Sequence, residues 1–302
     1  MIVRNFMFHD IRDLDFNFYP NRYKLKSFLT TDKFLKIIEF IESEYKIISS
    51  NQLNKLNELD RNKKYAVLTF DDGLADHYQT FKILKSKKLP ATFFVPVLPV
   101  TENKVIQTHK IQFIIASVED EKILTEEILE TTGNRKETYE MYSKTKWKNN
   151  WWSKDMIFIT NFLRNSIIPN KYEFTDYLFK KYVSDDECNF GSKFYLKESQ
   201  IREISESKIM TLGGHGNTSE NLLLVKDIEN EINSTKRFLS NFTDDLIFSY
   251  PNGGYNQNIK ESLIENGFTQ AFTINPFSIT ELDYEELNMM EIPRYDGAQK
   301  LL

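Results

Sequence analysis

Short apolar runs alternate with segments of helical spacing along the first hundred residues. Residues 2–8, 66–70 and 91–95 are compact apolar runs with many β-branched and aromatic side chains, which is typical of buried strands. Residues 34–41 and 78–84 carry apolar side chains at the three- and four-residue spacing of a helix face. Strands separated by helices predict a parallel sheet, either open or closed into a barrel.

Residues 98–207 interrupt this alternation with helical, aromatic-rich sequence, and strand patterns return after them. We therefore predict a single domain over residues 1–302, in which 98–207 form a largely helical insertion. The elements expected after the insertion are strands over 209–212, 246–250, 270–274 and 289–292 and helices over 225–239 and 259–266.

Polar clusters come directly after several of these strands. Asp71 and Asp72 end one strand, His215 follows the first strand after the insertion, and a turn over 251–255 follows the next strand. Because the carboxyl ends of parallel strands meet at one rim of a sheet or barrel, we expect these groups to converge there.

Composition narrows the class of protein. Of the 302 residues, 40% are hydrophobic and 27% are charged, which predicts a folded protein rather than a disordered one. The net charge of −5 and the lack of a lysine-rich run argue against nucleic acid as a partner. The single cysteine, Cys188, excludes an internal disulfide and favours a cytoplasmic location. No stretch resembles a signal peptide or has the roughly 20 apolar residues of a membrane span, so any membrane contact is expected to be peripheral.

The pair Asp71-Asp72 stands where a strand breaks into a turn at Gly73. Two adjacent carboxylates at such a break can diverge, one toward a metal and one toward a proton. The alternative is an Asp-Asp-Gly turn whose carboxylates only cap the following helix. The surrounding sequence favours the functional interpretation.

Residues 66–73, together with 83–85 and 90–95, resemble the polysaccharide deacetylases of NodB homology, carbohydrate esterase family four. This resemblance implies an α/β fold, namely a distorted, incomplete (β/α)7 barrel. It also implies a divalent metal cofactor, usually zinc. By position in the motif, Asp71 is the general base and Asp72 is a metal ligand.

The second motif of that family has two histidines four residues apart after a strand. Here His215 matches the first histidine, and Ser219 occupies the place of the second as a metal ligand. A serine hydroxyl is a much poorer zinc ligand than an imidazole. Glu220, Asn221 or a water could complete the site, a metal more tolerant of oxygen could be used, or the metal and the activity could both be lost. A lone histidine is more often a structural residue, but two preceding glycines and a strand favour a ligand role for His215.

Residues 248–256 resemble the third motif, in the tyrosine-proline form of exopolysaccharide deacetylases. In that form the backbone N–H after the proline helps to bind an oxyanion, and Asn252 is the matching position. A tight turn without a catalytic role is the alternative, since Pro-Asn-Gly is a common turn sequence. The neighbouring residues predicted to contact substrate are Tyr250, Pro251, Gly253 and Tyr255.

The last motif, Ile-Pro-Arg, resembles the ending of the exopolysaccharide subgroup. Arg294 is expected to orient Asp71 or to contact substrate, with a surface salt bridge as an equal alternative. The family often has a histidine nearby as general acid, but none is present here, so the acid is unassigned. His9 resembles the histidine of a Tyr-His pair after the first strand and is predicted to line the rim as a catalytic residue. His77 is expected at the surface. His109 begins a helix of the insertion and could swing over the site, although a surface position is the simpler interpretation.

Together the motifs predict metal-assisted removal of an N-acetyl group from an amino sugar. A cytoplasmic location favours a nucleotide- or lipid-linked precursor of a cell-surface polysaccharide as substrate. The alternatives are a non-catalytic carbohydrate-binding or scaffold protein without a complete metal site, and a deacylase for another N-acyl group such as formyl. A sugar-nucleotide glycosyltransferase is disfavoured, because its carboxylates are usually separated by one residue. Trp147, Trp151 and Trp152 could stack on sugar rings or contact a membrane surface or a lipid-linked substrate. We favour a third interpretation, in which they dock the insertion onto the barrel. The sequence predicts no oligomeric state.

Overall fold

The computed structural model describes residues 1–13, 28–133, 135–144, 152–165, 170–274 and 288–297. These residues divide into two compact units. The first, called the sheet unit here, comprises residues 1–13, 28–104 and 191–297, and the helical unit comprises residues 105–190. The outer parts of the segment 98–207 therefore belong to the sheet unit. Trp147 and Trp151 lie outside the described residues.

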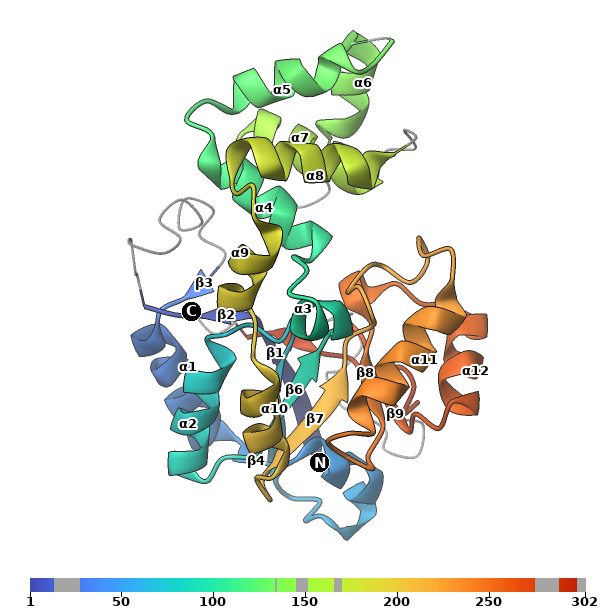
Figure 1. Cartoon of the computed structure of the whole chain (residues 1–302). Coiled ribbons are helices and arrows are strands. Elements are labelled where there is room, and N and C mark those ends of the chain that lie inside the picture. Colours follow the sequence, from blue (N-terminus) through green and yellow to red (C-terminus); the bar gives the residue numbers. More distant parts are fainter. Residues whose placement is uncertain (14–27, 134, 145–151, 166–169, 275–287, 298–302) are drawn as a thin grey trace. The chain divides into compact units, whose positions relative to one another are not determined.

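The sheet unit is built on parallel strands in the order β10-β1-β5-β6-β7-β8-β9, with β4 paired beside β5 (Figure 1). The sheet curls into a half-barrel, so the predicted incomplete (β/α) barrel is confirmed. The strands are β1 (Ile2–Phe8), β4 (Lys46–Ile47), β5 (Lys64–Phe70), β6 (Ala91–Val95), β7 (Met210–Gly214), β8 (Ile247–Ser249), β9 (Gln270–Phe272) and β10 (Tyr295–Asp296), and β2 (Asp10–Ile11) pairs separately with β3 (Phe28–Leu29).

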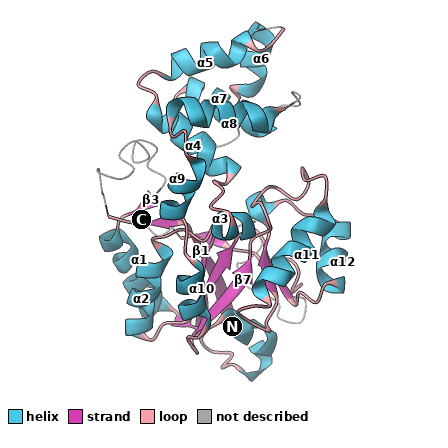
Figure 2. Cartoon of the chain, viewed as in Figure 1, coloured by secondary structure: helices cyan, strands magenta, loops and turns pink. Residues whose placement is uncertain are grey.

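Helices connect these strands, and α1, α2, α10, α11 and α12 lie outside the sheet (Figure 2). In α1 the apolar residues at helical spacing are buried, and the Thr30 hydroxyl accepts the N–H of Lys33 at the start of the helix. The helices of the sheet unit are α1 (Thr31–Glu44), η2 (Ser50–Glu58), α2 (His77–Lys87), α3 (Val97–Thr101), α10 (Glu198–Ser205), α11 (Ile228–Leu239), η3 (Pro251–Gly253) and α12 (Gln257–Glu265), and α9 (Glu187–Phe194) spans the boundary between the units.

Alternation along the strands separates two apolar clusters. In β5, Leu68 and Phe70 pack in the cluster that includes the surrounding helices, whereas Val67 packs in the cluster formed by strands and η2 inside the barrel. Thr69 and then Asp71, just beyond the strand, continue the inward series, and both are buried. The period of two thus directs Asp71 into the barrel.

One segment links the two edges of the curled sheet. Residues 289–291 form a turn, not the strand predicted there, and Ile292 makes a single bridge to Phe272 of β9 before the chain pairs with β1 as β10. The prediction was wrong because the Asn288 side chain accepts the N–H of Met290 at 2.9 Å, which forms a turn where strand pairing was expected.

The helical unit has a core of its own, which includes the fully buried side chains of Leu124, Phe158 and Leu178. His109 is buried here, so its predicted surface position is wrong, because almost every face of α4 is covered. The helices are α4 (Gln107–Ser117), α5 (Glu121–Glu130), α6 (Arg135–Tyr142), α7 (Lys154–Asn165) and α8 (Lys171–Tyr182). No helix in the described part of the chain is long and apolar enough to cross a membrane.

Candidate active site

Three inward-facing positions meet at the carboxyl ends of neighbouring strands. Asp71 follows β5, His215 follows β7, and Ser249 ends β8. All three are buried, and the Ser249 hydroxyl lies 3.3 Å from Asp71 Oδ2 while its carbonyl accepts a hydrogen bond from His215 Nδ1 at 3.0 Å. The expected convergence of Asp71 and His215 at one rim is therefore present, and Ser249 joins them.

Asp71 is held by a bidentate ion pair with Arg294. Arg294 Nη1 and Nη2 each donate to one carboxylate oxygen at 2.7 Å, and Nη1 and Nη2 also donate to the hydroxyls of Thr69 and Ser249. Its Nε donates to the carbonyl of Thr273 at 3.0 Å, and the side chain is fully buried. A surface salt bridge is thus excluded for Arg294, because every bond fixes the guanidinium against Asp71 inside the barrel.

The electrostatics of this pair keep Asp71 ionised. Burial by itself would raise the pKa of Asp71, but the charges of Arg294, His215 and His9 and the hydrogen bonds from Arg294 hold that pKa below its ordinary value. Asp71 is therefore an anion at neutral pH with both oxygens already oriented.

The three predicted metal ligands lie together beside this pair. Asp72 Oδ1 is 3.4 Å from His215 Nε2 and 3.5 Å from the Ser219 hydroxyl. Asp72 has a φ of 77° and Ser219 a φ of 60°, so both residues adopt the left-handed conformation that turns their side chains out of the regular strand direction. The Asp-Asp pair thus diverges as expected.

The spacing of these donors suits a divalent ion. Ligand atoms about 2.0–2.1 Å from a tetrahedral zinc ion lie about 3.4 Å from one another. The Nδ1–H of His215 donates to the Ser249 carbonyl, which directs Nε2 toward Asp72, where the neutral ring would have its lone pair. Among the described residues no group of three or more His, Cys, Asp or Glu side chains is arranged to hold a metal. The donor set is therefore one carboxylate, one imidazole and one weak hydroxyl.

The carboxylates around His215 raise its pKa. Burial alone would lower the pKa of His215, but the charges of Asp71 and Asp72 and the contact with Asp72 raise it above its ordinary value.

Asn221, suggested as a substitute ligand, accepts the N–H of Leu223 with its side-chain oxygen at 2.9 Å.

The turn after β8 carries Asn252, the residue whose N–H is the predicted oxyanion donor. Asn252 is exposed and has a φ of 52°, and Gly253 follows it with a φ of 66°. Pro251 is buried under the turn, and Tyr250 is fully buried, with its hydroxyl donating to the Met290 carbonyl at 3.0 Å. The half-buried Tyr255 stacks on Tyr250, with ring centroids 4.6 Å apart. Tyr250 thus supports the turn, and only Asn252, Gly253 and Tyr255 have surface available to a substrate.

The remaining histidines of the sheet unit differ in exposure. His9 is exposed after β1, and its charge acts on Asp71. His77 is fully buried, so its expected surface position is wrong. Its Nε2 donates to the His9 carbonyl at 2.9 Å, and its ring packs on Phe70 and Phe93. Burial lowers the pKa of His77 to about 4, which keeps it neutral at neutral pH.

Sequence reasoning missed two residues of this region, Ser249 and Glu231. Glu231 lies on α11, is buried, and accepts hydrogen bonds from the loop that carries His215 and Ser219. The sequence pattern indicated that Glu231 would be buried. Glu231 lies beside the apolar positions of an amphipathic helix and not on its polar face.

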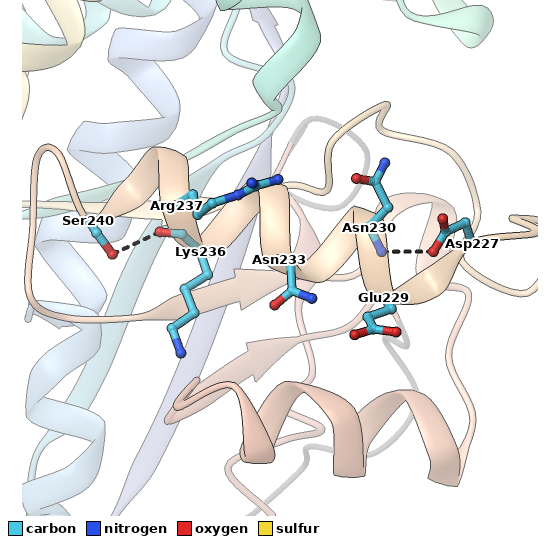
Figure 3. Close-up of a pocket in the computed structure, with 7 residues that line it drawn as sticks. All are labelled: Asp227, Glu229, Asn230, Asn233, Lys236, Arg237 and Ser240. Atoms are coloured by element: carbon cyan, nitrogen blue, oxygen red, sulfur yellow. Dashed lines mark hydrogen bonds between the residues drawn. The ribbon is translucent and has the colours of Figure 1, made fainter.

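A pocket lies on the opposite face of α11, and Figure 3 draws the residues that line it. None of the candidate site residues lines it. Its lining residues are Asp227, Glu229, Asn230, Asn233, Lys236, Arg237 and Ser240.

Comparison with protein families supports the predicted resemblance. The family model described as polysaccharide deacetylase matches residues 58–121, which include β5, the Asp71-Asp72 pair and β6. The resemblance predicted from these residues is confirmed. No curated protein matches the sequence.

Solved structures of low sequence identity share the fold. A polysaccharide deacetylase from Bacillus cereus is 14% identical with a TM-score of 0.55; the match covers 98% of this chain but only 65% of that one. The Streptococcus pyogenes deacetylase PplD, in complex with acetate, is 15% identical with a TM-score of 0.56, over 98% of this chain and 92% of that chain. IcaB from Ammonifex degensii is 13% identical with a TM-score of 0.55, over 97% and 91%.

Proposed function

We propose, from the family match over residues 58–121 and the shared fold, that the protein is a metal-dependent hydrolase that removes an N-acetyl group from an amino sugar. One observation carries the proposal. A carboxylate fixed by a buried arginine, Asp71, lies at the same rim as three convergent donors, Asp72, His215 and Ser219. A base and an adjacent electrophile site are the two parts that amide hydrolysis requires.

Each side chain has a distinct task in this proposal. A divalent ion, with zinc as the first choice, would be held by Asp72, His215 and Ser219 and would supply Lewis-acid activation of the acyl carbonyl and of water. Asp71, kept anionic by Arg294, accepts the proton of the attacking water. The backbone N–H of Asn252, an exposed residue, donates to the oxygen on which negative charge develops. Hydrolysis yields a carboxylate and a free amine.

The substrate and its location belong to the same proposal. We propose a precursor of a cell-surface polysaccharide, linked to a nucleotide or a lipid, that is processed in the cytoplasm at or near the membrane surface. The chain has a single cysteine, Cys188, which excludes an internal disulfide and supports a reducing compartment.

A second candidate is a non-catalytic carbohydrate-binding protein. The favouring observation is that Ser219 is a weak third donor and that the described residues hold no group of three stronger ones. This candidate predicts carbohydrate binding that does not depend on a divalent ion.

Carboxylate release from amino sugars tests the proposal. N-acetylated and N-formylated amino sugars, free, nucleotide-linked and lipid-linked, would be incubated with protein supplied with Zn²⁺, Co²⁺ or Mn²⁺. We expect release of acetate by the wild type and by the exposed-site control Asp244→Asn, and none by Asp71→Asn. Equal release by Asp71→Asn and the wild type would refute the role of Asp71. Binding of the sugar without release under any ion would favour the second candidate, and faster formate release would identify a deformylase.

A further inference from the structure

The loop after β7 carries two of the three donors and contains two left-handed residues. Gly216 has a φ of 75° and Ser219 a φ of 60°. For a residue other than glycine this conformation is unfavourable, so the surrounding structure must hold Ser219 in place. Contacts on two sides of the loop hold Ser219 in this conformation.

One side of the loop is fixed by backbone bonds. The N–H of Val97 and the N–H of Leu98, at the start of α3, donate to the carbonyls of Gly216 and Asn217 at 3.1 and 2.9 Å. Both bonds use loop carbonyl groups that precede Ser219, and neither uses an N–H group of the loop.

The other side of the loop is fixed by Glu231. Its Oε2 accepts the N–H of Asn217 at 2.6 Å and that of Thr218 at 3.1 Å, and its Oε1 accepts the Thr218 hydroxyl at 2.7 Å. The Thr218 hydroxyl in turn accepts the N–H of Glu220 at 3.2 Å. Ser219 is therefore flanked by two residues that are bound to Glu231, one directly and one through Thr218.

The Glu231 carboxylate is buried beside the loop. Glu231 is 3% exposed, and no ion pair is recorded for it within the described residues. A buried carboxylate is costly unless its hydrogen bonds compensate, and here all the bonds recorded for it come from the loop. A methyl group added at Gly216 would lie 3.0 Å from Glu231 Oε2, so the loop backbone approaches the carboxylate closely.

We propose that Glu231 is a positioning residue for the metal site, holding Ser219 in the left-handed turn that aims its hydroxyl at Asp72. The inference rests on the proposed function, since it concerns the same ion. Glu231 touches none of the donor atoms and acts only through the backbone and hydroxyl of the intervening residues.

The affinity for Zn²⁺, measured by calorimetry on folded protein, tests this inference through a double-mutant cycle of Glu231→Gln and Ser219→Ala. We expect Glu231→Gln to weaken Zn²⁺ binding about 10-fold or more, as loss of an outer partner of a ligand does. In the Ser219→Ala background the same change should have almost no further effect, because the group that Glu231 positions is absent. Glu229→Gln, an exposed change of equal charge on the same helix, should leave the affinity unchanged.

Two readouts separate positioning from a general structural role. The visible spectrum of the Co²⁺ form should change in the same way in Glu231→Gln and in Ser219→Ala, and Glu231→Asp should recover part of the Zn²⁺ affinity. Additive losses in the cycle, or an unchanged affinity in Glu231→Gln, would overturn the inference and leave the proposed function standing. A wild type that binds no divalent ion would overturn both.

Discussion

At the scale of single residues, the Arg294–Asp71 pair governs both stability and chemistry. Replacing Arg294 by Met would leave the buried Asp71 carboxylate without its cation. Because a broken buried pair leaves an uncompensated charge, we expect the free energy of unfolding to fall by about 3–5 kcal/mol in urea titrations. The matched variant Arg61→Met, at an exposed position, should change it by less than about 0.5 kcal/mol. If both variants lost a similar free energy of unfolding, the Arg294–Asp71 ion pair would not stabilise the fold.

His215 makes the stability of the metal-free protein depend on pH. Its folded-state pKa is raised above the ordinary value of 6.5, so protonated His215 contributes stability that is complete below that value and is lost as pH rises through the folded pKa. We expect the difference in unfolding free energy between wild type and His215→Gln, both with chelator, to be larger at about pH 6 than at about pH 9. His77, with its lowered pKa, is present in both proteins and cancels from the difference. A difference that does not vary with pH would contradict the assignment.

At the scale of elements, close packing of α11 against β7 keeps Glu231 near its loop. A methyl group at Gly214 would lie 2.2 Å from Cγ2 of the buried Thr235 on α11. We expect Gly214→Ala to lower the free energy of unfolding by about 1–3 kcal/mol and to weaken Zn²⁺ binding, because the helix must move. Gly133→Ala, where nothing lies within 4 Å of the added atom, is the matched control. If Gly214→Ala were destabilised but bound Zn²⁺ as tightly as the wild type, the metal site would not depend on the packing of α11 against β7.

The sequence was most informative at this scale. Strand and helix periods predicted the parallel sheet, and the rule that strand ends converge predicted the meeting of Asp71 with His215. It could not show that Arg294 enters the barrel, because that depends on the link from Ile292 to β9, which joins positions distant in sequence. The exposure of His77 was misjudged for a similar reason. Its burial results from contacts with Phe70 and Phe93 on two strands, which no local pattern contains.

At the scale of the whole molecule, the described residues divide into two compact units. Phe158, fully buried in the helical unit, tests how far the metal site depends on that unit. We expect Phe158→Ala to lower the stability of the helical unit by about 3–5 kcal/mol while the Zn²⁺ affinity at low temperature stays the same. Calorimetric unfolding and titration with Zn²⁺ on the same samples would check both. A matching fall in Zn²⁺ affinity would show that the site needs the helical unit.

In the proposed function, a divalent ion at Asp72, His215 and Ser219 and the base Asp71 act together on an acylated amino sugar. Acetate release should be measured from a substrate found in the screen, first on chelated protein and then after one equivalent of Zn²⁺ is added back. We predict that chelation abolishes release, that one equivalent restores it, and that Asp71→Asn binds the ion yet stays inactive. Acetate release that persists without any ion, or that is restored equally in Asp71→Asn, would show that the ion and Asp71 do not act together.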